Sequence, residues 1–171
     1  LERLPASLPG HGYEAAGLED ARAAVAAAYG RRGLPTSPEQ ILITHGAHNA
    51  LAHMLRLKVR PGDPVVIDHP TYLHAIDAIR AVGARPVPVG LPDGPQGHLQ
   101  GADDNCSGWD VEGVIEACRR SAAPLAYLVL DHHNPTGRLM GLADRTRLFE
   151  QTRGSRTLLV LDETLIDLTL S

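Results

Sequence analysis

The chain has 171 residues, of which 43% are hydrophobic and 21% are charged, and this composition is typical of a globular domain with a core of its own. Its net charge of −4 and pI near 6.1 argue against nucleic-acid binding by this segment, and no apolar run approaches the roughly 20 residues that a membrane-spanning helix needs. Cys106 and Cys118 are too few for a disulfide scaffold, so we expect free thiols, a reducing compartment and a cytoplasmic location.

The first half of the chain alternates helical and extended patterns. Residues 1–12 are rich in Pro and Gly and are expected to form an N-terminal arm. An Ala-rich segment with Glu19 and Asp20 in its first turn predicts a helix. In chain order we expect a helix over 18–32, a strand over 40–44, a helix over 47–57, a strand over 64–68, a helix over 72–82 and a strand over 84–89.

The second half continues the alternation after a loop-rich stretch over residues 90–108. Asp110 is a good N-cap for a helix over 111–120, and a strand over 125–130, a helix over 142–152 and a strand over 157–161 follow. Strands that alternate with helices predict an α/β fold with three layers, α/β/α, and a mainly parallel sheet.

The chain begins at Leu1 rather than Met and stops just after a strand with no closing helix. We therefore expect it to be a piece of a longer protein, with residues 13–171 forming an incomplete large domain.

Polar residues follow two of the predicted strands directly. Asn134–Gly137 (Asn-Pro-Thr-Gly) come after the apolar run over 125–130, and Asp162 comes after the strand over 157–161. Ligands bind at the carboxyl ends of the strands in open α/β sheets. The amide can donate to a ring oxygen and the carboxylate can keep a ring nitrogen protonated, so this pair suits a flat heteroaromatic ligand.

Two more strand-to-helix turns bear on a ligand. Gly46 lets the backbone approach closely, and the first amides of the next helix, near Ala47 and His48, form a phosphate site in physical terms. Tyr72 could lay its ring on a planar ligand, although a Tyr that simply packs at a helix start is the better explanation of this motif taken alone. Neither a Gly-x-x-x-x-Gly-Lys loop nor a Gly-x-Gly-x-x-Gly fingerprint is present.

Together these motifs resemble the pyridoxal-phosphate-dependent aminotransferases of class I/II, which have the aspartate aminotransferase fold type. The aminotransferase-like domain of MocR-type regulators is also similar. The resemblance runs from about His11 to Asp167. It rests on five motifs in order: Gly12-Tyr13 with Gly17-Leu18-x-x-Ala21-Arg22, Thr44-x-Gly46-Ala47-x-x-Ala50-Leu51, Asp68-x-Pro70-Thr71-Tyr72, Asn134-Pro135-Thr136-Gly137, and Asp162-Glu163-Thr164.

The resemblance implies pyridoxal 5′-phosphate (PLP) as cofactor and an amino acid or amine as substrate. It also implies a homodimer, because Tyr13 is similar to the tyrosine that reaches the phosphate of the partner subunit. The implied roles are phosphate binding for Gly46, Ala47 and His48, ring stacking for Tyr72, a bond to the phenolic oxygen for Asn134, and a bond to the pyridine nitrogen for Asp162.

The chain also departs from the family pattern. In the family the Schiff-base lysine lies downstream of the Asp162 motif, so the catalytic residue is unknown in this chain, and the substrate-carboxylate Arg and the small C-terminal domain are absent too. Thr164 and Leu165 occupy a stretch where relatives carry a Tyr, and His45 stands where Ser is common. Lys58 is the only lysine, and it lies about 15 Å along its helix from the phosphate end at the normal rise.

Three functions remain open from the sequence. The first is a fragment of a PLP-dependent aminotransferase, and the second is the effector-sensing, aminotransferase-like domain of a MocR/GntR-type transcription regulator. What precedes Leu1 would discriminate them, and a degenerate fragment without function is the third reading. His45, His48, His132 and His133 could lie near strand ends, but they form no metal-binding pattern. We therefore expect no metal site, and we expect His132 and His133 to line the cofactor turn instead.

Overall fold

The computed structural model describes residues 12–92 and 108–168. Backbone contacts divide the chain into two compact units, residues 1–46 and residues 47–171. Most of the predicted N-terminal arm, most of the predicted loop over 90–108, and Cys106 lie outside the described residues.

The first unit contains the predicted Ala-rich helix, α1 (Glu19–Arg31). Two acidic residues in its first turn and Arg31 in its last turn complement the helix dipole. Arg22 holds the helix to the segments that flank it, because its guanidinium donates to the carbonyls of Gly17 and Pro38 at 3.1 and 3.0 Å. The helix predicted over residues 18–32 is therefore confirmed.

The strand predicted over residues 40–44 is wrong. A 3₁₀ helix, η2 (Pro38–Gln40), ends there, and residues 41–44 have no regular secondary structure. The N–H of Ile43 donates to the carbonyl of Ala16 at 2.9 Å, and Ala16 does not belong to a strand. An apolar run of this length predicts a strand only when another strand pairs with it, and the described part of the first unit provides none.

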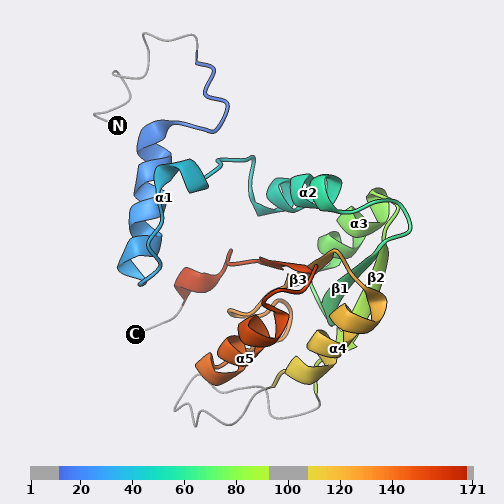
Figure 1. Ribbon diagram of the computed structural model, residues 1–171. Coiled ribbons are helices and arrows are strands. Elements are labelled where there is room, and N and C mark those ends of the chain that lie inside the picture. Colours follow the sequence, from blue (N-terminus) through green and yellow to red (C-terminus); the bar gives the residue numbers. More distant parts are fainter. Residues whose placement is uncertain (1–11, 93–107, 169–171) are drawn as a thin grey trace. The chain divides into compact units, whose positions relative to one another are not determined.

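The second unit alternates helices and strands as predicted (Figure 1). Its strands are β1 (Pro64–His69), β2 (Arg85–Gly90), β3 (Leu125–Leu128) and β4 (Leu158–Leu161). Its helices are α2 (Ala47–Lys58), α3 (Leu73–Ala81), α4 (Val111–Ser121) and α5 (Leu142–Thr152), followed by a 3₁₀ turn, η3 (Ile166–Leu168).

The four strands form one parallel sheet in the order β2-β1-β3-β4. Val65 pairs with Leu125, and Leu125 pairs with Leu158, so the central strands run in register through the sheet. A helix stands between each strand and the next one along the chain, as parallel pairing requires.

Helices cover both faces of this sheet (Figure 1). Side chains alternate along each strand, so Ile67 and Tyr127 pack with α2 and α3 on one face, while Val66 and Leu128 pack with α4 and α5 on the other. The central strands are thus buried on both sides, which explains their continuous apolar sequences. The predicted α/β/α architecture with a parallel sheet is confirmed.

Helix α4 shows how local sequence sets an element. Asp110 caps it by accepting a hydrogen bond from the N–H of Gly113 at 2.8 Å, as predicted. Its buried residues recur at the spacing of one helical face, and they are Val111, Val114, Ile115 and Cys118. Cys118 lies in this stripe as a free thiol, and burial raises its pKa despite a hydrogen bond with Thr157.

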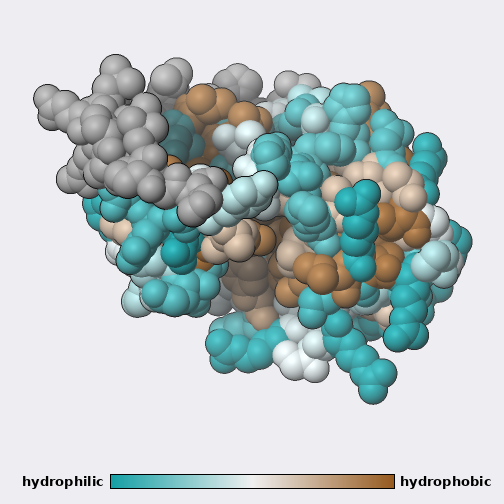
Figure 2. All heavy atoms as spheres, turned by 90° about the horizontal axis from the view of Figure 1, so that it is seen from above, coloured by the Kyte–Doolittle hydropathy of each residue, from teal (hydrophilic) through white to brown (hydrophobic). Residues whose placement is uncertain are grey.

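Apolar side chains also reach the surface among hydrophilic ones (Figure 2). In the second unit Leu57, Leu73 and Leu142 are the most exposed of the large apolar residues that the structure describes. Single exposed apolar residues are ordinary in globular proteins. None of the described helices is both long and apolar enough to cross a membrane.

Candidate functional site

The strand order places a crevice at the carboxyl ends of β1 and β3. The chain passes from β1 to β2 on one side, then crosses through α4 to β3 on the other side of β1. The connections after β1 and β3 therefore leave the sheet on opposite faces, which is the topological switch point where α/β proteins bind ligands.

A pocket of about 200 Å³ lies at this end of the second unit. Five of the seven sequence-predicted site residues line it together: Ala47, His48, Tyr72, Asn134 and Asp162. These residues come from the start of α2 and from the segments after β1, β3 and β4. Residues far apart in the sequence are thus brought together by the parallel sheet.

The other two predicted site residues, Tyr13 and Gly46, belong to the first unit. Tyr13 is 94% exposed. Gly46 has φ +93° and open space where a Cβ would stand, so its backbone conformation favours glycine. The roles predicted for these two residues stay predictions.

Asp162 has a hydrogen-bond partner on each carboxylate oxygen. The hydroxyl of Tyr127 donates to Oδ2 at 2.6 Å. The backbone N–H and the hydroxyl of Thr164 both donate to Oδ1, at 3.0 and 2.5 Å. The carboxylate is therefore oriented by three donors while it lines the pocket.

These donors also set the charge of Asp162. Burial by itself raises the pKa of this carboxyl, but the hydrogen bonds from the Thr164 side chain, from Tyr127 and from the Thr164 backbone outweigh it and hold the pKa below its ordinary value. Burial, followed by the hydrogen bond to Asp162, raises the pKa of Tyr127 far above its usual range, so the phenol stays a donor. The pocket thus contains an anionic carboxylate at neutral pH.

The sequence analysis missed Tyr127. It lies within the apolar run that predicts β3 and is 2% exposed. The available signal was that a phenol in a buried strand needs a polar partner, and a carboxylate follows the next strand. Thr164, which the sequence marked only as a departure from the family, also proves to hold Asp162.

The first half of α2 also lines the pocket, through Ala47, His48 and Leu51. The first turn of α2 has no acidic residue of its own, so no acidic side chain of that turn offsets the positive end of the helix dipole. Tyr72 lies just before α3. The centroid of its ring is 6.5 Å from that of the His48 ring, and the two rings meet at an interplanar angle of 84°. Tyr72 also lines the pocket, and its stacking on a flat ligand stays a prediction.

Beside the pocket lies a buried Asp68–His133 pair, which the sequence analysis did not single out. The two side chains are 1% and 0% exposed, and His133 Nε2 lies 3.3 Å from Asp68 Oδ2. The two atoms are close, but Nε2 has no acceptor in hydrogen-bonding geometry.

Lys58 is the last residue of α2 and is exposed, whereas Ala47 at the other end of that helix lines the pocket. The placement predicted for Lys58 is confirmed. Within residues 12–92 and 108–168 no group of three or more His, Cys, Asp or Glu side chains is arranged to hold a metal ion.

Residues 11–171 match the family Aminotransferase class I and II. The chain belongs to this family. It is 32% identical over 126 residues to a 2-aminoadipate transaminase from Thermus thermophilus, covering 74% of this chain and 28% of that protein. It is 30% identical over 115 residues to the uncharacterised HTH-type transcriptional regulator YdeF from Bacillus subtilis, covering 67% of this chain and 22% of the regulator. The chain thus spans less than a third of the length of these two relatives.

Solved structures of aminotransferases share the fold. The α-aminoadipate aminotransferase LysN from Thermus thermophilus, in complex with N-(5′-phosphopyridoxyl)-L-leucine, matches with a TM-score of 0.73 and 28% identity, over 94% of this chain and 38% of that one. A histidinol-phosphate aminotransferase from Sinorhizobium meliloti, in complex with pyridoxal-5′-phosphate, matches with a TM-score of 0.63 and 33% identity, over 86% of this chain and 36% of that one. The sequence-based assignment to the aminotransferase family is confirmed, and so is its likeness to regulators.

Proposed function

We propose that this chain supplies the PLP-binding site of an aminotransferase that acts on amino acids. The observation that carries the proposal is Asp162: an oriented carboxylate with a lowered pKa lines the same pocket as Asn134. A flat cofactor with a ring nitrogen and a ring oxygen needs this pair of groups. The family membership and the two structural relatives support it.

The residues present fit the cofactor. Asp162 would accept a hydrogen bond from the pyridine nitrogen and keep it protonated, and Asn134 would donate to the phenolic oxygen. Tyr72 would pack on the ring, and the free amides at Ala47 and His48 would bind the phosphate. When bound, PLP supplies an electron sink for the charge that develops on a substrate carbon.

The proposal extends to the assembly and the location of the protein. We propose a homodimer in which Tyr13 and Gly46 help to bind phosphate, Tyr13 serving the partner's site. We also propose residues 1–12 as an arm on a large domain that begins at residue 13, a biosynthetic role, and a cytoplasmic location. Light scattering of the naturally expressed protein tests the dimer, and a monomer that binds PLP fully would contradict it.

A second function is favoured by a specific observation, the 30% identity to the regulator YdeF. In that case the same pocket would bind PLP and sense an amino acid or amine instead of converting it. No residue of the pocket distinguishes the two functions, because both need the cofactor held in the same way.

The test uses the naturally expressed polypeptide that contains residues 1–171. PLP is added, cofactor absorbance is followed, and a panel of amino acids is offered with 2-oxoglutarate. PLP binding with formation of the matching 2-oxo acid supports the aminotransferase. PLP binding without turnover, together with sequence-specific DNA binding, supports the regulator, and a protein that does not bind PLP contradicts both.

A further inference from the structure

His133, the residue immediately before Asn134, is a histidine with no exposed side-chain surface. A buried polar ring is stable only if other groups compensate for its lost hydration. Three groups surround it. Its Nδ1 is 2.8 Å from the hydroxyl of Thr136, its Nε2 faces Asp68, and the ring of Trp109 meets it edge-on with 5.3 Å between centroids.

Asp68 links His133 to the sheet. The pairing of β1 with β3 ends at Ile67 and Tyr127. Beyond that point the N–H of Val129 donates to Oδ2 of Asp68 at 3.1 Å, so a side chain continues the ladder where the backbone of β1 no longer does. The same oxygen faces His133. One buried carboxylate therefore joins the end of β1, the end of β3 and the turn that follows β3.

The turn itself closes on His133. The backbone N–H of His133 donates to the carbonyl of Arg138 at 2.8 Å, and the carbonyl of His133 accepts from the N–H of Gly137 at 2.6 Å. Arg138 is buried and donates in turn to the carbonyls of Pro92 and Gly108. Asn134 lies inside this closed turn, yet it is exposed, so packing of its own side chain does not set its position.

We propose that His133 is a positioning residue for Asn134. Through Asp68 and Thr136 it anchors the Asn134–Gly137 turn at the switch point, so that the Asn134 amide faces the pocket. The part of the inference that concerns the cofactor rests on the proposed function, in which Asn134 donates to the phenolic oxygen of PLP. If His133 only filled space in the core, its replacement by another ring would leave the position of Asn134 unchanged.

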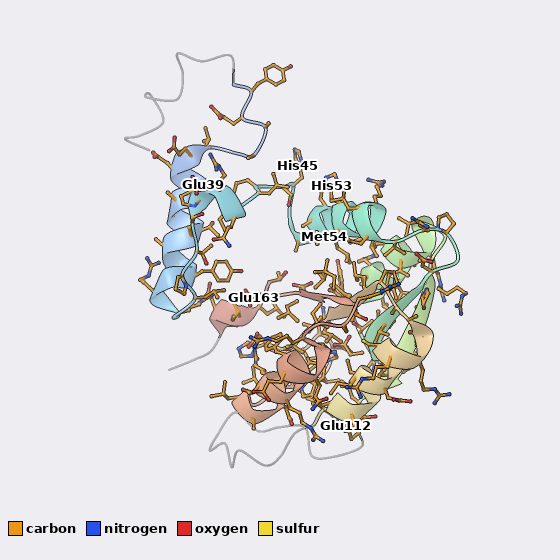
Figure 3. The ribbon with its side chains drawn as sticks, viewed as in Figure 1. Glu39, His45, His53, Met54, Glu112 and Glu163 are labelled. Atoms are coloured by element: carbon orange, nitrogen blue, oxygen red, sulfur yellow. The ribbon has the colours of Figure 1, made fainter. Side chains whose placement is uncertain are left out.

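The first experiment does not depend on the cofactor. Hydrogen–deuterium exchange is measured on the naturally expressed protein and on His133→Phe, which keeps a ring against Trp109 but removes both ring nitrogens. We expect the Gly137 amide to exchange at least about tenfold faster, while α2 is unchanged. His53→Phe is the matched control, because His53 is exposed and points away from the sheet on α2 (Figure 3). Unchanged exchange in the turn would overturn the proposal.

A second variant, Thr136→Val, tests the same anchor if the His133→Phe protein fails to fold. It removes the partner of Nδ1 from a half-buried position and leaves the Asp68 contact in place. We expect the same direction of change in the exchange of the turn, at about a third of the size. A Thr136→Val protein that folds and shows wild-type exchange would count against the anchor.

The second experiment is a double-mutant cycle on PLP affinity. His133→Phe and Asn134→Ala should each weaken PLP binding about tenfold or more, as misplacement of a binding group does. The double variant should be within about twofold of Asn134→Ala alone, because His133 acts through Asn134. His133→Gln, whose amide can still reach Asp68, should restore part of the affinity. Additive losses would overturn the positioning role.

The two experiments separate two kinds of failure. A wild-type protein that binds no PLP contradicts the proposed function, and the exchange data then still decide whether His133 anchors the turn. A protein that binds PLP but gives additive losses keeps the proposed function and loses the positioning role.

Discussion

Two aspartates lie at the same edge of the sheet, Asp68 near the end of β1 and Asp162 just after β4. Asp68 is 1% exposed, and one of its oxygens is shared by the backbone of Val129 and by His133. Asp162 is only half-buried, has donors on both oxygens and opens into the pocket. The same residue type at similar strand positions is thus suited to hold the fold together in one case and to meet a ligand in the other.

Solvent access and hydrogen-bond donors distinguish Asp162 from Asp68. A carboxylate that is sealed from solvent can act only on the groups packed against it, and at Asp68 these are parts of the chain itself. A carboxylate at a pocket wall keeps lone-pair directions available for a ligand, while its donors favour the charged form. The donors of Asp162 come from β3 and from the segment after β4, so the orientation of this carboxylate depends on the sheet.

The largest effect is expected from Asp162→Asn, which keeps the shape of the side chain but removes its charge. The pyridine nitrogen would no longer be held protonated, so we expect turnover by the naturally expressed protein to fall by about a hundredfold or more. Cofactor affinity should fall much less, since the phosphate and ring contacts remain. Steady-state kinetics and a PLP titration measure the two effects, and unchanged turnover would remove Asp162 from its role.

Asp68→Ala should act on stability instead. It leaves the Val129 N–H without its acceptor and removes the carboxylate that His133 faces, and loss of one partner from a buried pair costs about 3 kcal/mol of unfolding free energy. Asp68→Asn keeps an acceptor oxygen, so it should cost about 1 kcal/mol. Urea denaturation measures both. If Asp68→Ala were as stable as the wild type, the contrast between the two aspartates would be lost.

Much of this arrangement could be predicted from the sequence, because strands and helices of the second unit have strong apolar periods and the ligand-facing residues follow strands directly. Asn134 and Asp162 are examples. The strand over residues 40–44 could not be predicted correctly, since an apolar run alone does not say whether a partner strand exists. Tyr127 was missed, and the pairing of His133 with Asp68 was not predicted, because the partners lie 35 and 65 residues away in the sequence and only the folded chain brings each pair together.

Tyr127→Phe tests how far the charge of Asp162 depends on its donors. Phe fills the same space but cannot donate, so the pKa of Asp162 should rise from its lowered value toward the ordinary one. A carboxylate with a lowered pKa contributes above that pKa, and its contribution is lost as the pH falls through it. The acid limb of the activity profile should therefore move to higher pH.

At neutral pH the same variant should lose about tenfold in turnover, which is less than Asp162→Asn loses, because one hydrogen bond to a charged group is removed and the charge remains. The pH–rate profile of the wild-type protein is the reference. A profile that keeps its acid limb while turnover falls would mean that Tyr127 orients Asp162 without setting its charge.

The smallest effect is expected from Thr164→Val. The hydroxyl of Thr164 donates to Oδ1 of Asp162, but the backbone N–H of the same residue donates to the same oxygen, and that bond survives the substitution. We expect a loss of about two- to threefold in turnover, and a shift of the acid limb toward higher pH in the same direction as for Tyr127→Phe. Parallel pH profiles of the two variants measure this order. If Thr164→Val lowered turnover more than Tyr127→Phe does, the segment after β4, rather than β3, would control the carboxylate. The difference between Asp162 and Asp68 would then come from local chain geometry instead of from contacts across the sheet.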